Sequence, residues 1–81
     1  MKERYYSTVE YTDRFGKANR RFEIYADEGA KPTIGDYVDA FARSGMDVQI
    51  TDFLDMIFKP TDPAISPLIS LRVIRTLKDY S

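Results

Sequence analysis

The sequence of 81 residues contains neither cysteine nor histidine. Without cysteine, disulfide scaffolds, thiol catalysis and thiolate metal sites are excluded, and a chain without disulfides is typical of the cytoplasm. Without histidine, the usual general base near neutral pH is missing, together with every Ser-His or Cys-His nucleophile arrangement. Most hydrolase mechanisms are therefore excluded, and we expect a protein with no enzymatic activity and no cofactor.

Sequence signals for phosphate binding, membrane insertion and secretion are also missing. The four glycines stand at positions 16, 29, 35 and 45, too far apart for a loop that cradles phosphate. No apolar run approaches the roughly 18 residues that a membrane span requires, and the first residues, MKERYYST, lack the apolar core of a signal peptide. We therefore expect a cytoplasmic protein that makes no contact with a membrane.

The residues that are present indicate one folded domain. Hydrophobic residues make up 43% of the chain, and six Tyr and five Phe make it too aromatic for a disordered segment. A chain of this size buries roughly 60 to 65% of its unfolded surface, which supports only one core. We expect a single α+β domain over residues 1–81.

The segment 33–45 has the clearest pattern in the chain and predicts a helix. Thr33 can cap the first turn while Asp36 reaches back to it, and Gly45 can end the helix in a left-handed conformation. One side of the predicted helix is an apolar stripe made of Ile34, Tyr37, Val38 and Phe41. The opposite side consists of Asp36, Asp39, Ala40 and Arg43.

Residues 4–26 predict a β-hairpin, because Tyr, Val, Thr, Phe and Ile dominate two runs around one glycine. A two-residue turn at Phe15 and Gly16 would place Val9 opposite Phe22. The side chains expected on the outer face are those of Tyr6, Thr8, Glu10, Arg21, Glu23 and Tyr25.

Residues 47–59 allow two interpretations. They fit a second amphipathic helix whose apolar residues are Ile50, Phe53, Leu54, Ile57 and Phe58. They also fit a strand, although a strand would bury Asp52 among apolar neighbours. We favour the helix.

Residues 68–78 follow a proline-rich loop and alternate as a strand does, although Pro67 would also suit a helix start. We expect a strand that pairs with the N-terminal hairpin. The predicted architecture is ββααβ, an antiparallel sheet with one or two helices packed on one face, and the alternative order is ββαββ.

The net charge is −1, but the charges are segregated along the chain. Basic residues predominate in 1–21 and in 63–81, whereas acidic residues predominate in 22–62. Within the acidic part, the pairs Asp36 with Asp39 and Asp52 with Asp55 would each project two carboxylates from one side of a helix. Such pairs can hold Mg²⁺ with substrate phosphates, but solvated aspartates near helix starts are the more ordinary interpretation. No metal is expected.

We expect Asp36, Asp39, Asp52 and Asp55 to form an acidic face that binds a basic protein partner. The chain would then be a non-catalytic interaction module. From size and charge we expect the class of phage or mobile-element accessory or inhibitor proteins that bind a host protein, such as a defence nuclease complex.

The alternative function is nucleic-acid binding through the basic hairpin residues Arg14, Lys17, Arg20 and Arg21. Tyr6 and Tyr25 would then offer stacking surfaces. Exposed aromatics and free sheet edges would also allow a homodimer. For the acidic face and for the basic hairpin residues alike, the competing interpretation is an ordinary solvated surface.

Overall fold

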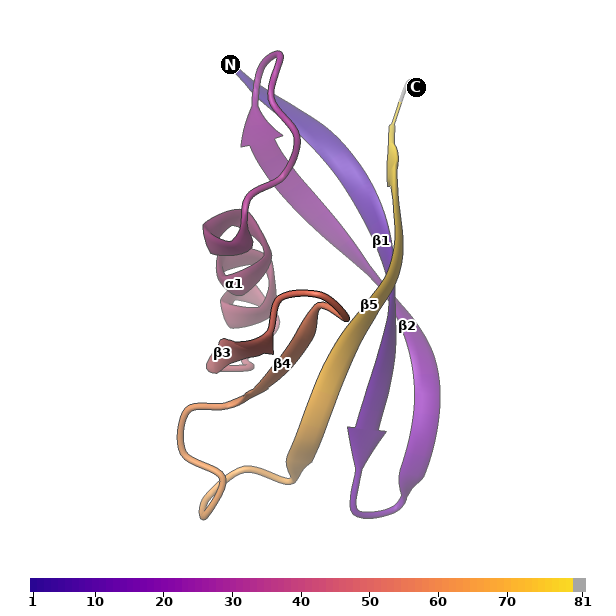
Figure 1. Ribbon diagram of the computed structural model, residues 1–81, viewed down its shortest axis with the longest axis vertical. Coiled ribbons are helices and arrows are strands. Elements are labelled where there is room, and N and C mark those ends of the chain that lie inside the picture. The colour runs from indigo at the N-terminus through magenta and orange to yellow at the C-terminus, as the bar shows by residue number, and fades with distance from the viewer. Residues whose placement is uncertain (80–81) are drawn as a thin grey trace.

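Five antiparallel strands and one helix follow one another in the order ββαβββ (Figure 1). The computed structural model describes residues 1–79, so residues 80 and 81 of the expected domain lie outside it. The elements are β1 (Lys2–Asp13), β2 (Gly16–Asp27), α1 (Ile34–Arg43), β3 (Val48–Asp52), β4 (Ile57–Pro60) and β5 (Leu68–Lys78). The sheet order is β2-β1-β5-β4-β3. The expected α+β class is confirmed, but the orders ββααβ and ββαββ are both wrong.

The hairpin of β1 and β2 is confirmed, with a different turn from the one expected. The Asp13 carboxylate accepts the backbone N–H groups of Phe15 and Gly16 at 2.8 and 3.0 Å, which places the two-residue turn one position earlier. Phe22 therefore lies opposite Ser7, so the predicted pairing with Val9 is wrong. Because the partner moves by two residues, every side chain stays on its expected face of the sheet.

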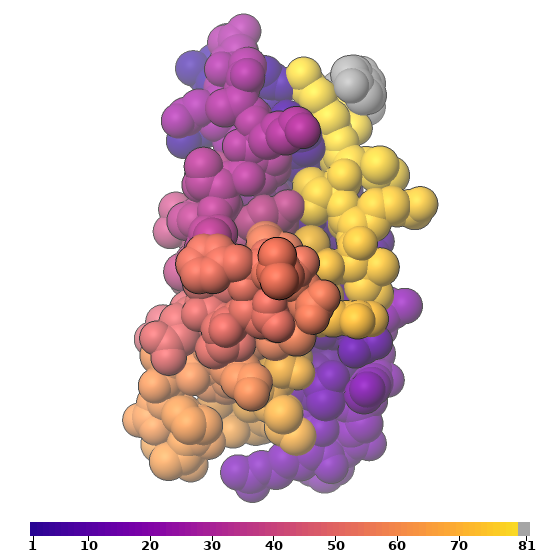
Figure 2. Space-filling model, in the orientation of Figure 1, coloured from indigo at the N-terminus to yellow at the C-terminus, as the bar shows by residue number. Residues whose placement is uncertain are grey.

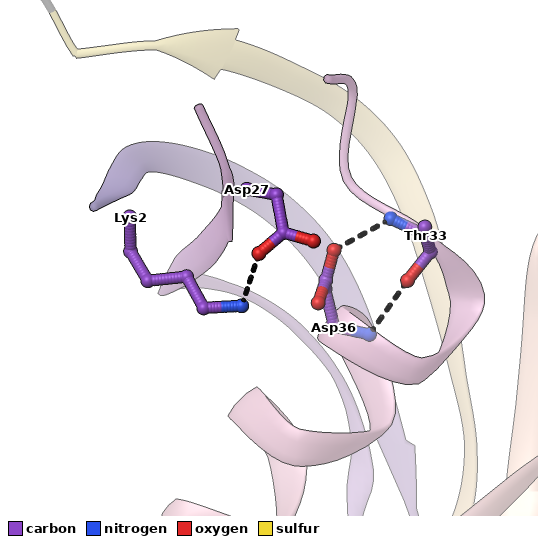
Figure 3. A network of polar contacts seen from close by, with 4 residues as sticks. All are labelled: Lys2, Asp27, Thr33 and Asp36. Carbon is purple, nitrogen blue, oxygen red and sulfur yellow. Dashed lines mark hydrogen bonds and ion pairs between the residues drawn. The ribbon is translucent and has the colours of Figure 1, made fainter. Parts of the chain in front are cut away.

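The predicted helix is confirmed at both ends. The N–H of Thr33 donates to the Asp36 carboxylate at 2.9 Å, and the N–H of Asp36 donates to the Thr33 hydroxyl at 3.2 Å (Figure 3). At the other end, Gly45 has a φ of +84° and the N–H of Met46 donates to the carbonyl of Phe41 at 2.9 Å. These contacts are the capping box and the Schellman motif.

α1 lies on one face of the sheet and contacts both β2 and β3. Phe41 is fully buried, with its ring centroid 5.1 Å from that of Phe22 and 5.2 Å from that of Phe58. All four residues of the predicted apolar stripe pack in or against the core. Ala40 is also buried, so its placement on the outer side was wrong.

The helix expected over 47–59 is wrong, because these residues form a hairpin of β3 and β4. The Asp52 carboxylate accepts the N–H groups of Leu54 and Asp55 at 2.9 and 3.1 Å, and Met56 has a φ of +51°, so the chain reverses here. Phe53 and Leu54, which belonged to the predicted helical stripe, are exposed. Asp52 stands at the strand end, where its side chain forms the turn and avoids the burial that argued against a strand.

The strand expected over 68–78 is confirmed as β5, which pairs with β1 as predicted. It also pairs with β4, and thereby joins the two hairpins into one sheet. A partly buried polar contact lies between β5, β1 and α1. The Thr76 hydroxyl hydrogen-bonds to the Tyr37 hydroxyl at 2.7 Å and to the Ser7 hydroxyl.

Glu3 links β1 to the chain segments beside it. Its carboxylate forms an ion pair with Lys78 and accepts the N–H of Gly29 at 2.8 Å. The Lys78 hydrogen bond, and then the Gly29 N–H, lower the pKa of Glu3 below its ordinary value of 4.5. A lowered pKa stabilises the folded state above about pH 4.5, and this contribution is lost as the pH falls through the folded value.

We therefore expect Glu3→Gln to reduce the loss of thermal stability on acidification below about pH 4.5. Melting temperatures measured from neutral to acidic pH provide the test. Glu28→Gln, which removes an exposed carboxyl group nearby, is the control and should keep the wild-type pH profile. Parallel profiles for Glu3→Gln and wild type would contradict this role of Glu3.

Candidate binding surfaces

The two faces of the β1–β2–β5 sheet have different surroundings. In Figure 1, α1 and the β3–β4 hairpin lie to the left of these strands, and among residues 1–79 no element covers their other side. We call the side chains of β1, β2 and β5 that point away from α1 the open face. The strand registers place there, among others, Arg4, Tyr6, Thr8, Glu10, Thr12, Lys17, Asn19, Arg21, Glu23, Tyr25, Ser70, Arg72, Arg75 and Leu77. This set includes all six residues expected on the outer face. Tyr25, on the edge strand, also has its ring centroid 5.1 Å from the guanidinium of Arg43 on α1.

The open face brings two arginines from distant parts of the chain into one row. Thr8 pairs with Arg21 on β2 and with Arg75 on β5, so the two arginines flank it. Two strand spacings separate their backbones by about 10 Å. Within residues 1–79 neither arginine takes part in an ion pair. This row is therefore an unneutralised positive site.

Tyr6 lies in the next row of the open face, between Glu23 and Leu77. The guanidinium carbons of Arg21 and Arg4 lie 4.6 and 5.5 Å from its ring centroid, within the range of cation–π attraction. A groove of about 320 Å³ lies beside this ring. Its lining residues are Tyr6, Thr8, Arg21, Arg75, Leu77, Lys78 and Asp79.

The carboxylates on this side of the sheet are occupied by neighbours. Glu10 lies 4.0 Å from the Lys17 ammonium and 3.9 Å from the Arg72 guanidinium. The Glu23 carboxylate accepts the hydroxyl of Tyr25 at 2.9 Å. Asp79 accepts the Nε–H of Arg4 at 2.7 Å. None of these contacts involves Arg21 or Arg75, although the Glu23 and Asp79 carboxylates lie in the neighbouring row and groove.

The four basic residues predicted as one nucleic-acid contact do not share one face. Lys17 and Arg21 lie on the open face, and Arg14 is in the exposed turn. Arg20 points to the helix side, where its guanidinium lies 5.3 Å from the Tyr11 ring centroid. Arg75 was missed in the sequence, although the alternating pattern of 68–78 placed it on a strand.

The acidic middle of the chain lies along one side of the view in Figure 2. Figure 2 shows the segment from the β2–α1 loop to the loop after β4 as one band along the molecule, coloured magenta to orange. We call the carboxylates carried by this band the acidic face. They are Asp27, Glu28, Asp36, Asp39, Asp47, Asp52, Asp55 and Asp62.

One of these carboxylates, that of Asp27, contacts Lys2, and two more at the start of α1 act on it through their charge. Lys2 forms an ion pair with Asp27 at 2.7 Å (Figure 3). The hydrogen bond and charge of Asp27 raise the pKa of Lys2, and the charges of Asp36 and Asp39 raise it further. One ammonium group therefore lies within the field of three carboxylates.

The four aspartates predicted as a partner site divide into two kinds. Asp36 and Asp52 accept backbone N–H groups, in the helix cap and in the β3–β4 turn. Asp39 and Asp55 are exposed, and within residues 1–79 their carboxylates make no hydrogen bond or ion pair. The expectation that Asp52 and Asp55 project from a helix is wrong, because both belong to the hairpin.

The structure also bears on metal and membrane binding. Among residues 1–79, no three carboxylates lie close enough together to hold a metal ion. The helix found in this range has 10 residues, and no helix there is long and apolar enough to cross a bilayer.

A further open groove of about 420 Å³ lies between the end of α1 and the 61–67 loop, and Arg20, Asp47 and Asp62 contribute its charged lining.

This chain matches no protein-family model, no curated protein and no solved structure. Its surfaces are therefore the basis for assigning a function.

Proposed function

We propose that this protein is a non-catalytic interaction module that binds a protein partner with a basic surface through its acidic face. The supporting observation is that residues 27–62 form one band along the molecule and carry eight carboxylates against three basic side chains, those of Lys31, Arg43 and Lys59. A one-sided charge distribution orients a small protein during its approach to an oppositely charged partner and accelerates association.

The partner's chemistry follows from the charge of this face. Clefts that hold nucleic acid are rich in Lys and Arg, so an acidic module can compete with nucleic acid for such a cleft. An accessory or inhibitor protein of a phage or mobile element acting on a host defence nuclease would work in this way.

The division of the four aspartates determines which variant tests the proposal. Asp36 and Asp52 stay unchanged, because losing their contacts with backbone N–H groups would destabilise the fold. Asp39→Asn combined with Asp55→Asn removes two exposed charges and should change the free energy of unfolding by less than about 0.5 kcal/mol.

We expect the Asp39→Asn/Asp55→Asn variant to bind the partner about three- to tenfold more weakly than wild type, because exposed charge pairs contribute little individually. Tagged wild-type and variant proteins would be used to capture partners from the native host, with quantification by mass spectrometry at low and moderate salt. Affinities for each protein that wild type retains would then be measured with purified components.

The matched control is Glu10→Gln combined with Glu23→Gln, which changes the net charge equally but lies on the open face. It should leave capture unchanged. Equal losses with both double variants would show that only net charge matters, and no loss with Asp39→Asn/Asp55→Asn would remove the acidic face from the proposal.

A further inference from the structure

We infer that the open face binds single-stranded nucleic acid, with Arg21 and Arg75 contacting phosphates and Tyr6 stacking on a base. This site lies across the sheet from the acidic face and does not depend on it. Both surfaces could be occupied at once, as in a module that joins a nucleic-acid-binding protein to its nucleic acid.

The charge of the row is the first argument. Arg21 and Arg75 flank Thr8 on neighbouring strands and have no ion-pair partner within residues 1–79. Two like charges on one face repel each other, and neither arginine is ion-paired within residues 1–79, although the Asp79 carboxylate lines the same groove. A strand of phosphates crossing the row would neutralise both guanidinium groups, which matches the charge complementarity of nucleic-acid surfaces.

The aromatic group beside the row is the second argument. Tyr6 is half-buried, carries the Arg21 guanidinium 4.6 Å from its ring centroid, and borders a groove of about 320 Å³. Proteins that bind single strands combine a positive groove with aromatic rings on which bases stack, and bases also stack on Arg guanidinium planes. In this groove the Arg21 guanidinium lies over the Tyr6 ring, so a base can stack on this pair of planar groups.

The same two arguments select the ligand. A duplex keeps its bases stacked inside, so it offers phosphates to the arginines but no free base to Tyr6. An acidic peptide offers carboxylates but has no regular planar group for the surface of Tyr6 and Leu77. A single strand supplies both the phosphates and the planar bases.

The test measures binding of the 81-residue chain to fluorescent oligothymidylate and oligouridylate of about 12 nucleotides by anisotropy. A DNA duplex and a polyglutamate peptide serve as comparison probes. We expect binding of the single strands that weakens between about 50 and 200 mM salt, and weaker binding of both comparison probes.

Arg21→Gln combined with Arg75→Gln should lower the salt dependence, the slope of log K against log salt concentration, by about 1.4. The control, Arg14→Gln combined with Lys31→Gln, removes the same charge from exposed loops and should retain the wild-type slope. Tyr6→Leu should weaken binding about tenfold or more, while Tyr6→Phe should bind like wild type. Thermal melting would establish that each variant is folded.

Amide chemical shifts of the wild-type protein provide a measurement that does not depend on variants. Titration with oligothymidylate should shift the signals of Tyr6, Thr8, Arg21 and Arg75 and leave those of α1 unchanged. The inference would be overturned if the two double variants had equal slopes of log K against log salt concentration. It would also be overturned if the amide shifts were centred on α1, or if no single strand bound at low salt. If polyglutamate bound more tightly than the single strands, the open face would be assigned to an acidic protein instead. If the duplex bound as tightly as the single strands, the requirement for unpaired bases would be overturned.

Discussion

Replacing Phe41 with Ala is expected to lower the free energy of unfolding by about 3 to 5 kcal/mol. Phe41 is fully buried where α1 meets the sheet, and its ring makes edge-to-face contacts with Phe22 and Phe58. A single-domain chain of this length has a total stability of about 4 to 12 kcal/mol, so the cavity would remove a large share of it. Urea denaturation should show a lower midpoint with an unchanged slope.

Phe53→Ala is the control for this experiment, because Phe53 lies in the β3–β4 turn with 68% of its surface exposed. Its effect should stay within about 0.5 kcal/mol. If Phe41→Ala fails to fold, Phe41→Leu keeps most of the apolar volume and should cost about 1 to 2 kcal/mol. Similar small losses for the alanine variants of Phe41 and Phe53 would contradict the central role of Phe41.

Thr76→Val is expected to cost about 2 to 4 kcal/mol, although valine has nearly the shape of threonine. The Thr76 hydroxyl is the hydrogen-bond partner of both Ser7 and Tyr37, and Ser7 is fully buried. Losing this hydroxyl leaves two polar groups without their partner, and each unsatisfied buried group costs about 1 to 3 kcal/mol. The control is Thr12→Val on the open face of β1, where the threonine hydroxyl makes no hydrogen bond within residues 1–79 and the change should stay within about 0.5 kcal/mol.

A double-mutant cycle separates the loss of partners from a change in packing. Ser7→Ala added to Thr76→Val removes one of the orphaned hydroxyls, so it should destabilise less than it does in the wild-type background. Additive losses would show that the two hydroxyls act independently and would contradict the proposed contact.

The helix could be predicted closely because all its signals are local. Thr33 and Asp36 are three residues apart and form the capping box by themselves, and Gly45 supplies the positive φ that ends the helix. The hairpin was predicted for the same reason. Its register was missed because Asp13 accepts the N–H groups of the turn and Gly16 takes its positive φ directly after the two central residues instead of being one of them.

The segment 47–59 could not be predicted because its apolar residues fit both a helical stripe and two short strands. The pairing of β4 with β5 decides between them, and this contact joins residues distant in sequence. Phe58 then packs on Phe41 in the core, whereas Phe53 and Leu54 become exposed. Local propensity carries no information about such a partner.

The sequence by itself determined the α+β class, the helix with both its ends, the N-terminal hairpin, the last strand and the separation of acidic from basic segments. Only the tertiary structure decided which charges act together. Strand pairing placed Arg21 and Arg75 on either side of Thr8 and sent Arg20 to the opposite face. The physical reason is that side-chain direction alternates along a strand, whereas neighbours across a sheet depend on registers formed between distant segments.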